Sequence, residues 1–314
     1  MTAGMAGREA VAATANRVAL TRAAWQAEEC AARALAAADA AMADAGTPDV
    51  ANPTSALFGI APEQLARRWR TLDTAVARSP LVPRDRGCAV RLTAAGTTVA
   101  LTLGDAAEGD AMHRLLGALR VAPPLADSLV DALLDWRDAD DTPRAAGAEA
   151  DWYRTQGRPP PRNAPFAAAA ELDRVRGFDS TALDARVPGL HAAVQARVGV
   201  DDAPVDLSHA PREVLLALPG MTPDAVAAIL ALRARTPAAV VDLASVAARL
   251  PRDAAAAFGA QLPALQTRAV PEPAAWIVTA SGVSGTPAVT AVVELRVARV
   301  VARIAVVRRR SWVE

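Results

Sequence analysis

The stretch DSLVDALLDWRDADDTPRAAGAEADWY, from Asp127 to Tyr153, joins a helical pattern to a run of acidic residues. Apolar residues recur at helical spacing in its first half, which predicts a helix with one apolar face: Leu129, Val130, Leu133, Leu134 and Trp136. Pro123 and Pro124 precede this helix, and Asp127 can cap or charge its first turn. We expect the helix to run into the acidic residues until Pro143 stops it, because proline lacks the amide hydrogen and clashes with the preceding turn.

Five carboxylates follow one another closely in the second half of this stretch: Asp138, Asp140, Asp141, Glu149 and Asp151. They repel one another unless a cation lies among them. Arg137 and Arg144 could supply that charge, and Ca²⁺ would do so better, because it takes roughly six to eight oxygen ligands in irregular loops. The order of the acids resembles an EF-hand loop, but Pro143 replaces the turn glycine, which excludes an EF-hand. Spacing alone favours a calcium site and a solvated acidic loop equally.

The acidic stretch also carries a family resemblance. The run LLDWRDADDTPRAAGAEADWY, followed by Asn163-Ala-Pro-Phe and by Glu171-Leu172…Val175-Arg176-Gly177-Phe178, resembles the type II secretion minor pseudopilin K (GspK) family. In that family the corresponding stretch lies in a calcium-binding helical domain. The family pattern falls on Asp135, Trp136, Asp138, Asp140, Gly147, Ala148, Glu149 and Tyr153. The resemblance covers most of residues 85–310 and implies calcium as a cofactor.

Composition sets broad limits. The 314 residues are enough for two domains with a sizeable core. Lys+Arg and Asp+Glu both number 34, and this balance argues against a nucleic-acid binder that relies on bulk charge. The chain is rich in alanine and low in aromatic residues, with 52% hydrophobic residues, and this composition predicts a helix-rich globular protein.

The two cysteines and the N-terminus bear on the cellular compartment. Cys30 and Cys88 permit one disulfide in an oxidising compartment, but buried free thiols are the favoured interpretation. No run approaches the ~18–20 apolar residues of a membrane span, and residues 1–15 lack the apolar core of a signal peptide. Family members begin with a leader and a long apolar helix, so we expect a periplasmic portion. Inner-membrane anchoring, by a segment not present in this chain, is implied only by the resemblance.

The order of elements predicts an α+β fold. A long helix is expected over residues 8–45, ended by Gly46-Thr47-Pro48, and a second helical run over 62–78. Alternating patterns predict a hairpin of strands 88–93 and 97–103 and further strands at 275–282, 288–297 and 300–307, with helices from 105 to 265. The long helix suits a bundle or a pilin. Together with the resemblance, the order favours a pilin-like domain (1–104 and 266–314), built from the long helix and an antiparallel sheet, around a large inserted all-α domain (105–265).

Within the inserted region, Glu213 to Arg233 resembles a helix-hairpin-helix. Its hairpin is Pro219-Gly220-Met221, Thr222 caps the second helix and Pro223 is the first helical residue. DNA binding by such a hairpin needs basic residues around it, and the nearby cations Arg212, Arg233 and Arg235 need not share a face. A structural role is therefore favoured. Arg308–Arg310 make the C-terminal end basic, and a solvated strand face explains them.

No catalytic set is recognisable. His113, His191 and His209 are far apart in sequence and lack partners at metal-ligand spacing, so ordinary core or surface positions are expected. A Gly-rich phosphate loop and a nucleophile motif are both absent from the sequence.

The leading hypothesis is therefore a structural subunit and not an enzyme. The resemblance implies a minor pseudopilin at the tip of the periplasmic pseudopilus, where it nucleates or caps assembly for protein export across the outer membrane. It also implies that minor pseudopilins I and J are the partners, held through the N-terminal helix. The alternative is a helix-hairpin-helix nucleic-acid-binding protein, and a metal-dependent hydrolase ranks last.

Overall fold

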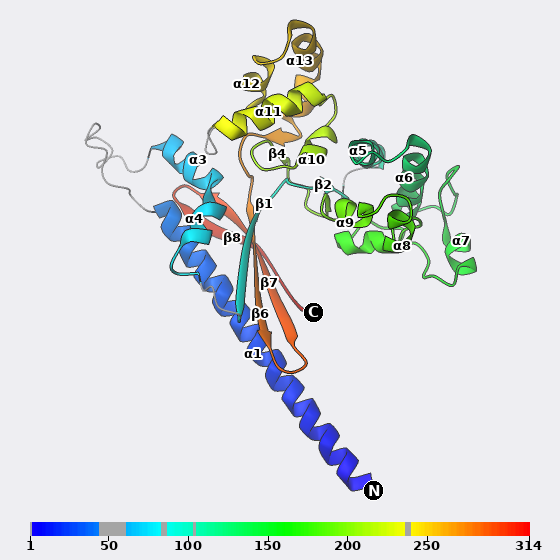
Figure 1. Ribbon diagram of the computed structural model, residues 1–314, viewed down its shortest axis with the longest axis vertical. Helices are drawn as coiled ribbons and strands as arrows, with labels where there is room; N and C mark the ends of the chain where they lie inside the picture. Colours follow the sequence, from blue (N-terminus) through cyan, green and yellow to red (C-terminus); the bar gives the residue numbers. More distant parts are fainter. Residues whose placement is uncertain (1, 44–60, 83–86, 103–104, 236–239) are drawn as a thin grey trace. The chain divides into compact units, whose positions relative to one another are not determined.

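The computed structural model of this chain describes residues 2–43, 61–82, 87–102, 105–235 and 240–314. The chain divides into two compact units (Figure 1). The first unit combines Met1–Ala94 with Ala275–Glu314, and the second is the intervening segment Ala95–Ala274. Each unit has a hydrophobic core of its own.

The predicted long N-terminal helix is confirmed as α1, Thr2–Ala43. Alanines form its buried face at helical spacing: Ala23, Ala27, Ala34 and Ala38. Val11 and Trp25, two of the large apolar residues of this helix, are instead each 72% exposed. The predicted stop at Gly46-Thr47-Pro48 lies outside the described residues. None of the described helices carries an apolar stretch long enough to cross a membrane.

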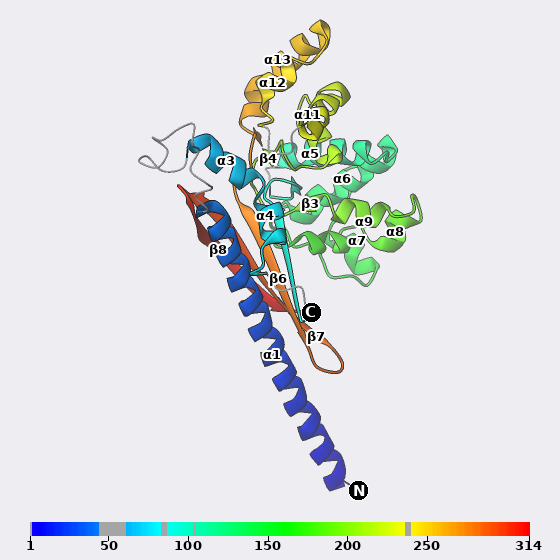
Figure 2. The same cartoon turned by 60° about the vertical axis from the view of Figure 1, so that its left-hand side comes forward.

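Helix α1 lies along one face of an antiparallel sheet (Figures 1 and 2). The strand order is β1-β6-β7-β8, from Cys88–Ala94, Trp276–Ser284, Val289–Val300 and Arg303–Val313. Alternate residues on the face toward α1 are buried, among them Val278, Ala280, Val293 and Leu295. The helix and the sheet approach each other closely at Gly282 of β6, where a Cβ would overlap the backbone of Ala23 and Ala27. The three predicted C-terminal strands are thus confirmed.

The pairing of β1 with β6 shows how the second unit is inserted. Ala94, the last residue of β1, pairs with Trp276, the first residue of β6. The chain therefore leaves the sheet and returns to it at one register position, and everything between lies in the second unit. The predicted hairpin of residues 88–93 and 97–103 is wrong.

The chain does turn at Ala95-Gly96, but it does not fold back along β1, because Gly96 lies against the backbone of Pro204 and Asp206. Gly96 has a φ of +78°, and a Cβ there would overlap the carbonyl of Pro204. Its own carbonyl accepts a hydrogen bond of 2.9 Å from the amide of Asp206. Strand β2, Val99–Ala100, then pairs in parallel with β3, Val198–Gly199, inside the second unit.

Two short helices pack beside α1 in the first unit. The predicted run over 62–78 is divided at Thr71 into α3, Pro62–Arg70, and α4, Leu72–Arg78. Trp69 of α3 meets Trp276 edge to face, with ring centroids 6.4 Å apart, and the indole N–H of Trp276 donates to the carbonyl of Trp69 at 2.9 Å. This pair lies at the end of β6 where the chain re-enters the sheet.

A disulfide joins Cys30 of α1 to Cys88, the first residue of β1, with the two Cα atoms 6.0 Å apart. The favoured interpretation of free thiols is therefore wrong. Cys30 lies on the buried alanine face of α1, which brings its sulfur against the sheet edge. Sequence spacing alone carries no sign of that approach.

The second unit is mostly helical, but the region expected to be all-α also contains short strands. Its parallel pairings are β2 with β3 and β4, Val205–Asp206, with β5, Ala269–Val270. Its helices are α5 Asp105–Ala118, α6 Pro123–Arg137, α7 Ala150–Thr155, α8 Ser180–Asp184, α9 Leu190–Gln195, α10 Arg212–Leu216, α11 Pro223–Arg235, α12 Leu243–Ala247 and α13 Arg252–Gln266, with a 3-10 turn at Ala169–Arg174. Aromatic residues anchor the core: Trp136, Tyr153, Phe166, Phe178 and Phe258.

The disulfide should stabilise the first unit measurably. It closes a separation of 58 residues, which corresponds to roughly 4 kcal/mol of loop entropy in the unfolded chain. We expect Cys30→Ala/Cys88→Ala to lower the unfolding midpoint of this unit by on the order of 10 °C in calorimetry. Reductant should shift the wild type in the same way and leave the double variant unchanged. Equal midpoints for the two proteins without reductant would contradict this role.

Candidate metal site in the acidic loop

The acidic loop begins earlier than the sequence pattern suggests. Helix α6 ends at Arg137, and Asp138 is already extended, so the predicted continuation to Pro143 is wrong. Side chains of the loop compete with the helix for backbone groups: Asp140 Oδ1 accepts the amide of Thr142 at 2.8 Å. At the other end, Pro123 is the first helical residue, and Asp127 does not cap the helix but lies 2.9 Å from His113 Nε2.

Asp135, in the last turn of α6, organises the loop. Its side chain is fully buried and accepts hydrogen bonds from the backbone amide of Arg144, at 3.1 Å, and from the Arg144 guanidinium, at 2.6 Å. Gly147 passes so close that a Cβ there would overlap the Asp135 carboxylate. Asp135 belongs to the pattern that carries the family resemblance, but it was not among the predicted ligands. The available signal was its i, i+3 spacing from Asp138.

Arg144 joins two of the carboxylates. Its Nη1 lies 2.6 Å from Asp135 Oδ1 and 2.5 Å from Asp138 Oδ2. Burial by itself would disfavour the charge on Arg144, but the hydrogen bonds with Asp138 and Asp135 outweigh it and raise the pKa of the guanidinium. Arg144 therefore keeps its positive charge beside these two carboxylates.

Glu149 is buried without compensation. It is 4% exposed, and both of its carboxylate oxygens are buried with no hydrogen-bond partner in the described part of the chain. Burial, and then the charges of Asp135, Asp138, Asp141 and Asp140, raise the pKa of Glu149 to about 7. A buried carboxylate without a hydrogen-bond partner destabilises the folded protein by on the order of several kcal/mol. A cation bound to Glu149 would offset this penalty.

Asp135, Asp138 and Glu149 form the carboxylate cluster, in which one oxygen of each residue lies within 4.8 Å of the others. Three hard oxygen ligands, two of them on buried residues, suit Ca²⁺ better than a soft or nitrogen-preferring metal. Asp138 also has a buried oxygen, Oδ1, without a hydrogen-bond partner among the described residues. The donor set and these unsatisfied oxygens both fit a hard divalent cation.

The structure brings together two of the five predicted ligands, Asp138 and Glu149, and adds Asp135. Asp141 and Asp151 line a hollow of about 440 Å³ beside Glu149. Asp151 is 93% exposed at its side chain and pairs with Arg154, and Asp140 is exposed at the turn to Thr142. These three acids surround the carboxylate cluster without entering it.

A further layer of contacts holds the loop in place. Arg176 donates to the carbonyl of Gly147 at 2.7 Å, and its guanidinium lies 5.1 Å from the centroid of the Trp152 ring. The buried Tyr153 hydroxyl accepts the amide of Arg176 at 2.9 Å, and burial raises the pKa of Tyr153 to about 12. Trp136 donates through its indole N–H to Glu171 at 3.1 Å. These residues belong to the stretches that carry the family resemblance, and their contacts hold the loop in position.

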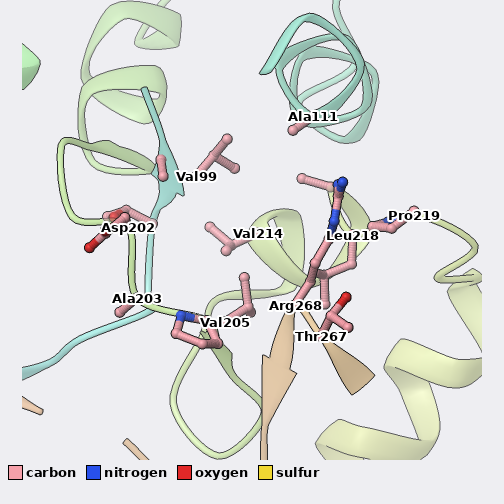
Figure 3. Close-up of a pocket in the computed structure, with 14 residues that line it drawn as sticks. Val99, Ala111, Asp202, Ala203, Val205, Val214, Leu218, Pro219, Thr267 and Arg268 are labelled. Atoms are coloured by element: carbon pink, nitrogen blue, oxygen red, sulfur yellow. The ribbon is translucent and has the colours of Figure 1, made fainter. Parts of the chain in front are cut away.

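The second unit also contains a small apolar hollow of about 150 Å³ (Figure 3). Val99, Val205, Val214 and Leu218 line it, and Arg268 extends along one side (Figure 3). Its volume is below the roughly 300–1,000 Å³ of typical ligand pockets.

In residues 213–233, the segment that resembles a helix-hairpin-helix, the hairpin packs against another helix. Gly220 in the hairpin has a φ of +70°, and a Cβ there would overlap the side chain of Gln261 from α13. Arg233 donates to the carbonyls of Leu207 and Ala210, both at 2.8 Å, and burial lowers the pKa of its guanidinium. The nucleic-acid alternative finds no support in this geometry.

The three histidines each meet a different aspartate. The pairs are His113 with Asp127, His191 with Asp173, and His209 with Asp206. They lie on separate elements, and none of them joins the carboxylate cluster.

The raised pKa of Glu149 predicts an unusual pH dependence in metal-free protein. The folded-state pKa of Glu149, about 7, exceeds the ordinary 4.5, so folding favours the protonated carboxyl group. The contribution of this group to the stability of the fold is complete below pH 4.5 and is lost as the pH rises through about 7. With chelator present, we expect Glu149→Gln to be more stable than wild type at pH 8, by on the order of 2 kcal/mol in urea unfolding.

Glu213→Gln is a matched control with the opposite sign. Burial opposes the charge of Glu213, but the hydrogen bond from Arg197 prevails and lowers its pKa. Its stabilisation is therefore present above the unfolded-state pKa and lost as the pH falls through the lower folded-state value. We expect Glu213→Gln to destabilise the protein at pH 8. A Glu149→Gln variant that is also destabilised in chelator at pH 8 would refute the uncompensated burial of Glu149.

Comparisons with known proteins agree with the fold and with the loop. Residues 97–193 match the family model described as Type II secretion system (T2SS), protein K. A chain in the crystal structure of the GspK-GspI-GspJ complex from the enterotoxigenic Escherichia coli type 2 secretion system shares the fold. The two align with a TM-score of 0.51 and 16% sequence identity, over 73% of this chain and 81% of that chain. No curated protein matches this chain significantly. The family match, which includes the acidic loop, and the shared fold confirm the resemblance of this chain to protein K of the type II secretion system.

Proposed function

We propose that this protein is a minor pseudopilin of the type II secretion system, with a structural and not an enzymatic role. The observation that carries the proposal is the insertion of a protein K segment, residues 97–193, between two paired strands of a helix-and-sheet unit. In this role the protein stands at the tip of the periplasmic pseudopilus. There it nucleates or caps assembly for export across the outer membrane.

The inserted unit supports a tip position. It contains Ala95–Ala274, more of the chain than the unit that carries α1 and the sheet. A subunit repeated along a tightly packed filament has little room for such an addition. A terminal subunit has one free end and can carry it.

We infer that the partners are minor pseudopilins I and J, and that α1 holds them. The supporting observation is the set of exposed apolar side chains on α1, with Val11 and Trp25 as its most exposed large members. Val11 lines a hollow together with small residues of α1, among them Ala10, Ala15 and Ala19, and with Gly285 of the β6–β7 turn. Small residues next to protruding apolar ones suit the docking of another helix.

The compartment follows from the same proposal. The disulfide between Cys30 and Cys88 suits an oxidising environment such as the bacterial periplasm. A periplasmic site of action and anchoring in the inner membrane, as in the family, are both part of this proposal.

We also propose that calcium binds at the carboxylate cluster. Asp135, Asp138 and Glu149 would hold the ion, and the negative charges of Asp140 and Asp141, which already raise the pKa of Glu149, would attract it. When bound, calcium supplies charge neutralisation and a link between the end of α6 and the start of α7. Contacts among aromatic residues and with Arg176 would hold the loop in position around the ion.

Calcium should stabilise the protein through Glu149. We expect Glu149→Ala to lower the melting midpoint relative to wild type by several degrees in calcium and not in chelator, because only the bound ion depends on this carboxylate. Calorimetric titration of stripped protein measures binding directly. Asp224→Asn, an exposed acid on α11, is the control and should behave as wild type. Equal shifts with and without chelator would refute the site.

The partner surface can be tested with soluble forms of I and J. We expect Val11→Glu and Trp25→Ala to weaken complex formation at least about tenfold in titrations, because each removes an exposed apolar contact. Val240→Glu changes a 46% exposed valine in the second unit and should leave complex formation intact. Wild-type affinity in both α1 variants would show that this face of α1 is not the interface.

A further inference from the structure

Arg144 lies where a metal ion would need its ligands. Its Nη1 contacts one oxygen of Asp135 and one of Asp138, two of the three residues of the carboxylate cluster. A carboxylate oxygen that accepts so short a hydrogen bond is a poorer ligand for a metal. A guanidinium and a divalent cation held by the same carboxylates would also repel each other, which weakens binding of the ion.

Glu149 shows that the cluster is built for more charge than Arg144 supplies. Both Glu149 oxygens and Asp138 Oδ1 are buried without a hydrogen-bond partner among the described residues. Glu149 itself is 4% exposed and belongs to the cluster. One guanidinium therefore satisfies only part of the cluster, and the unsatisfied oxygens point to a second, exchangeable cation.

The attachments of Arg144 differ in a way that permits exchange. Its backbone amide is bound to the fully buried Asp135, which fixes the loop at that point. Its side chain is 33% exposed, so the guanidinium lies at the solvent side of the cluster and can turn outward without unfolding of the loop.

We propose that Arg144 is a built-in competitor of the metal ion, an inference that rests on the proposed calcium site. In metal-free protein its guanidinium neutralises Asp135 and Asp138 and holds the loop near its final shape. A divalent cation that binds to Asp135, Asp138 and Glu149 displaces the guanidinium into solvent. Arg144 thereby lowers the calcium affinity and stabilises the metal-free protein, so the site responds to changes in free calcium instead of retaining the ion permanently.

The test compares calcium titrations of chelator-stripped wild type, Arg144→Met and Arg154→Met by calorimetry, with melting curves in calcium and in chelator. We expect Arg144→Met to bind calcium at least about tenfold more tightly, because the repulsion and the competing hydrogen bonds are gone. Its midpoint should fall in chelator and equal or exceed that of wild type in calcium. Arg154 pairs with the exposed Asp151 in the same region, so Arg154→Met is the matched control and should bind like wild type.

A purely structural Arg144 predicts the opposite sign. If wild type binds calcium and Arg144→Met binds it equally or more weakly, competition is refuted and the calcium site stands. If neither protein binds calcium, both the site and the competition are refuted. If Arg144→Met does not fold in chelator, Arg144→Gln and Arg144→Lys are titrated instead. Tighter binding by Arg144→Gln than by Arg144→Lys supports competition between charges, and equal affinities refute it.

Discussion

The antiparallel pairing of β1 with β6 is the contact on which the rest of the architecture depends. It joins residues from the two ends of the chain in one sheet, with Ala94 opposite Trp276. At one end of β1, Cys88 is bonded to α1, and at the other end Trp276 packs on Trp69. The pairing is thus fixed at both ends by contacts that do not involve the inserted unit. An insertion at this position leaves the sheet and α1 intact, which is why a large second unit is tolerated.

In the second unit, the carboxylates of the cluster repel one another, and the contacts around them must overcome this repulsion. Three carboxylates of the cluster approach one another because Asp135 is fixed by the loop backbone and Glu149 is buried at the start of α7. Arg144 offsets part of this repulsion, and burial together with the remaining negative charges raises the pKa of Glu149. A sequence selected only for stability would replace such a residue, since a buried carboxylate without a partner is costly. The uncompensated burial of Glu149 is the observation on which the proposed ion site rests.

Local patterns were sufficient to predict that α1 and the three C-terminal strands exist. In the strands, alternating apolar residues mark the buried face, whereas alanines form the buried face of α1 and two of its large apolar residues are exposed. They failed at β1, because the choice of strand partner depends on residues up to 194 positions away in the sequence, as Cys88 pairs with Gly282. They failed again at the end of α6, where Asp140 and Thr142 form a turn that competes with the helix. Asp135 was hidden for a related reason. A carboxylate on an otherwise apolar helix is expected to face solvent. Asp135 is buried instead, because the loop after α6 folds back over it.

The two units divide the proposed function between them. The exposed apolar residues of α1 belong to a unit held by a disulfide and a sheet, and the carboxylate cluster lies outside that unit. The cluster lies in the other unit and is backed by Trp136, Tyr153 and Arg176, so an ion there would chiefly order the segment from the end of α6 to α7. Partner binding through α1 and calcium binding through the loop should therefore be separable by mutation. A loss of both from one loop variant would require the units to be coupled more tightly than their separate cores imply.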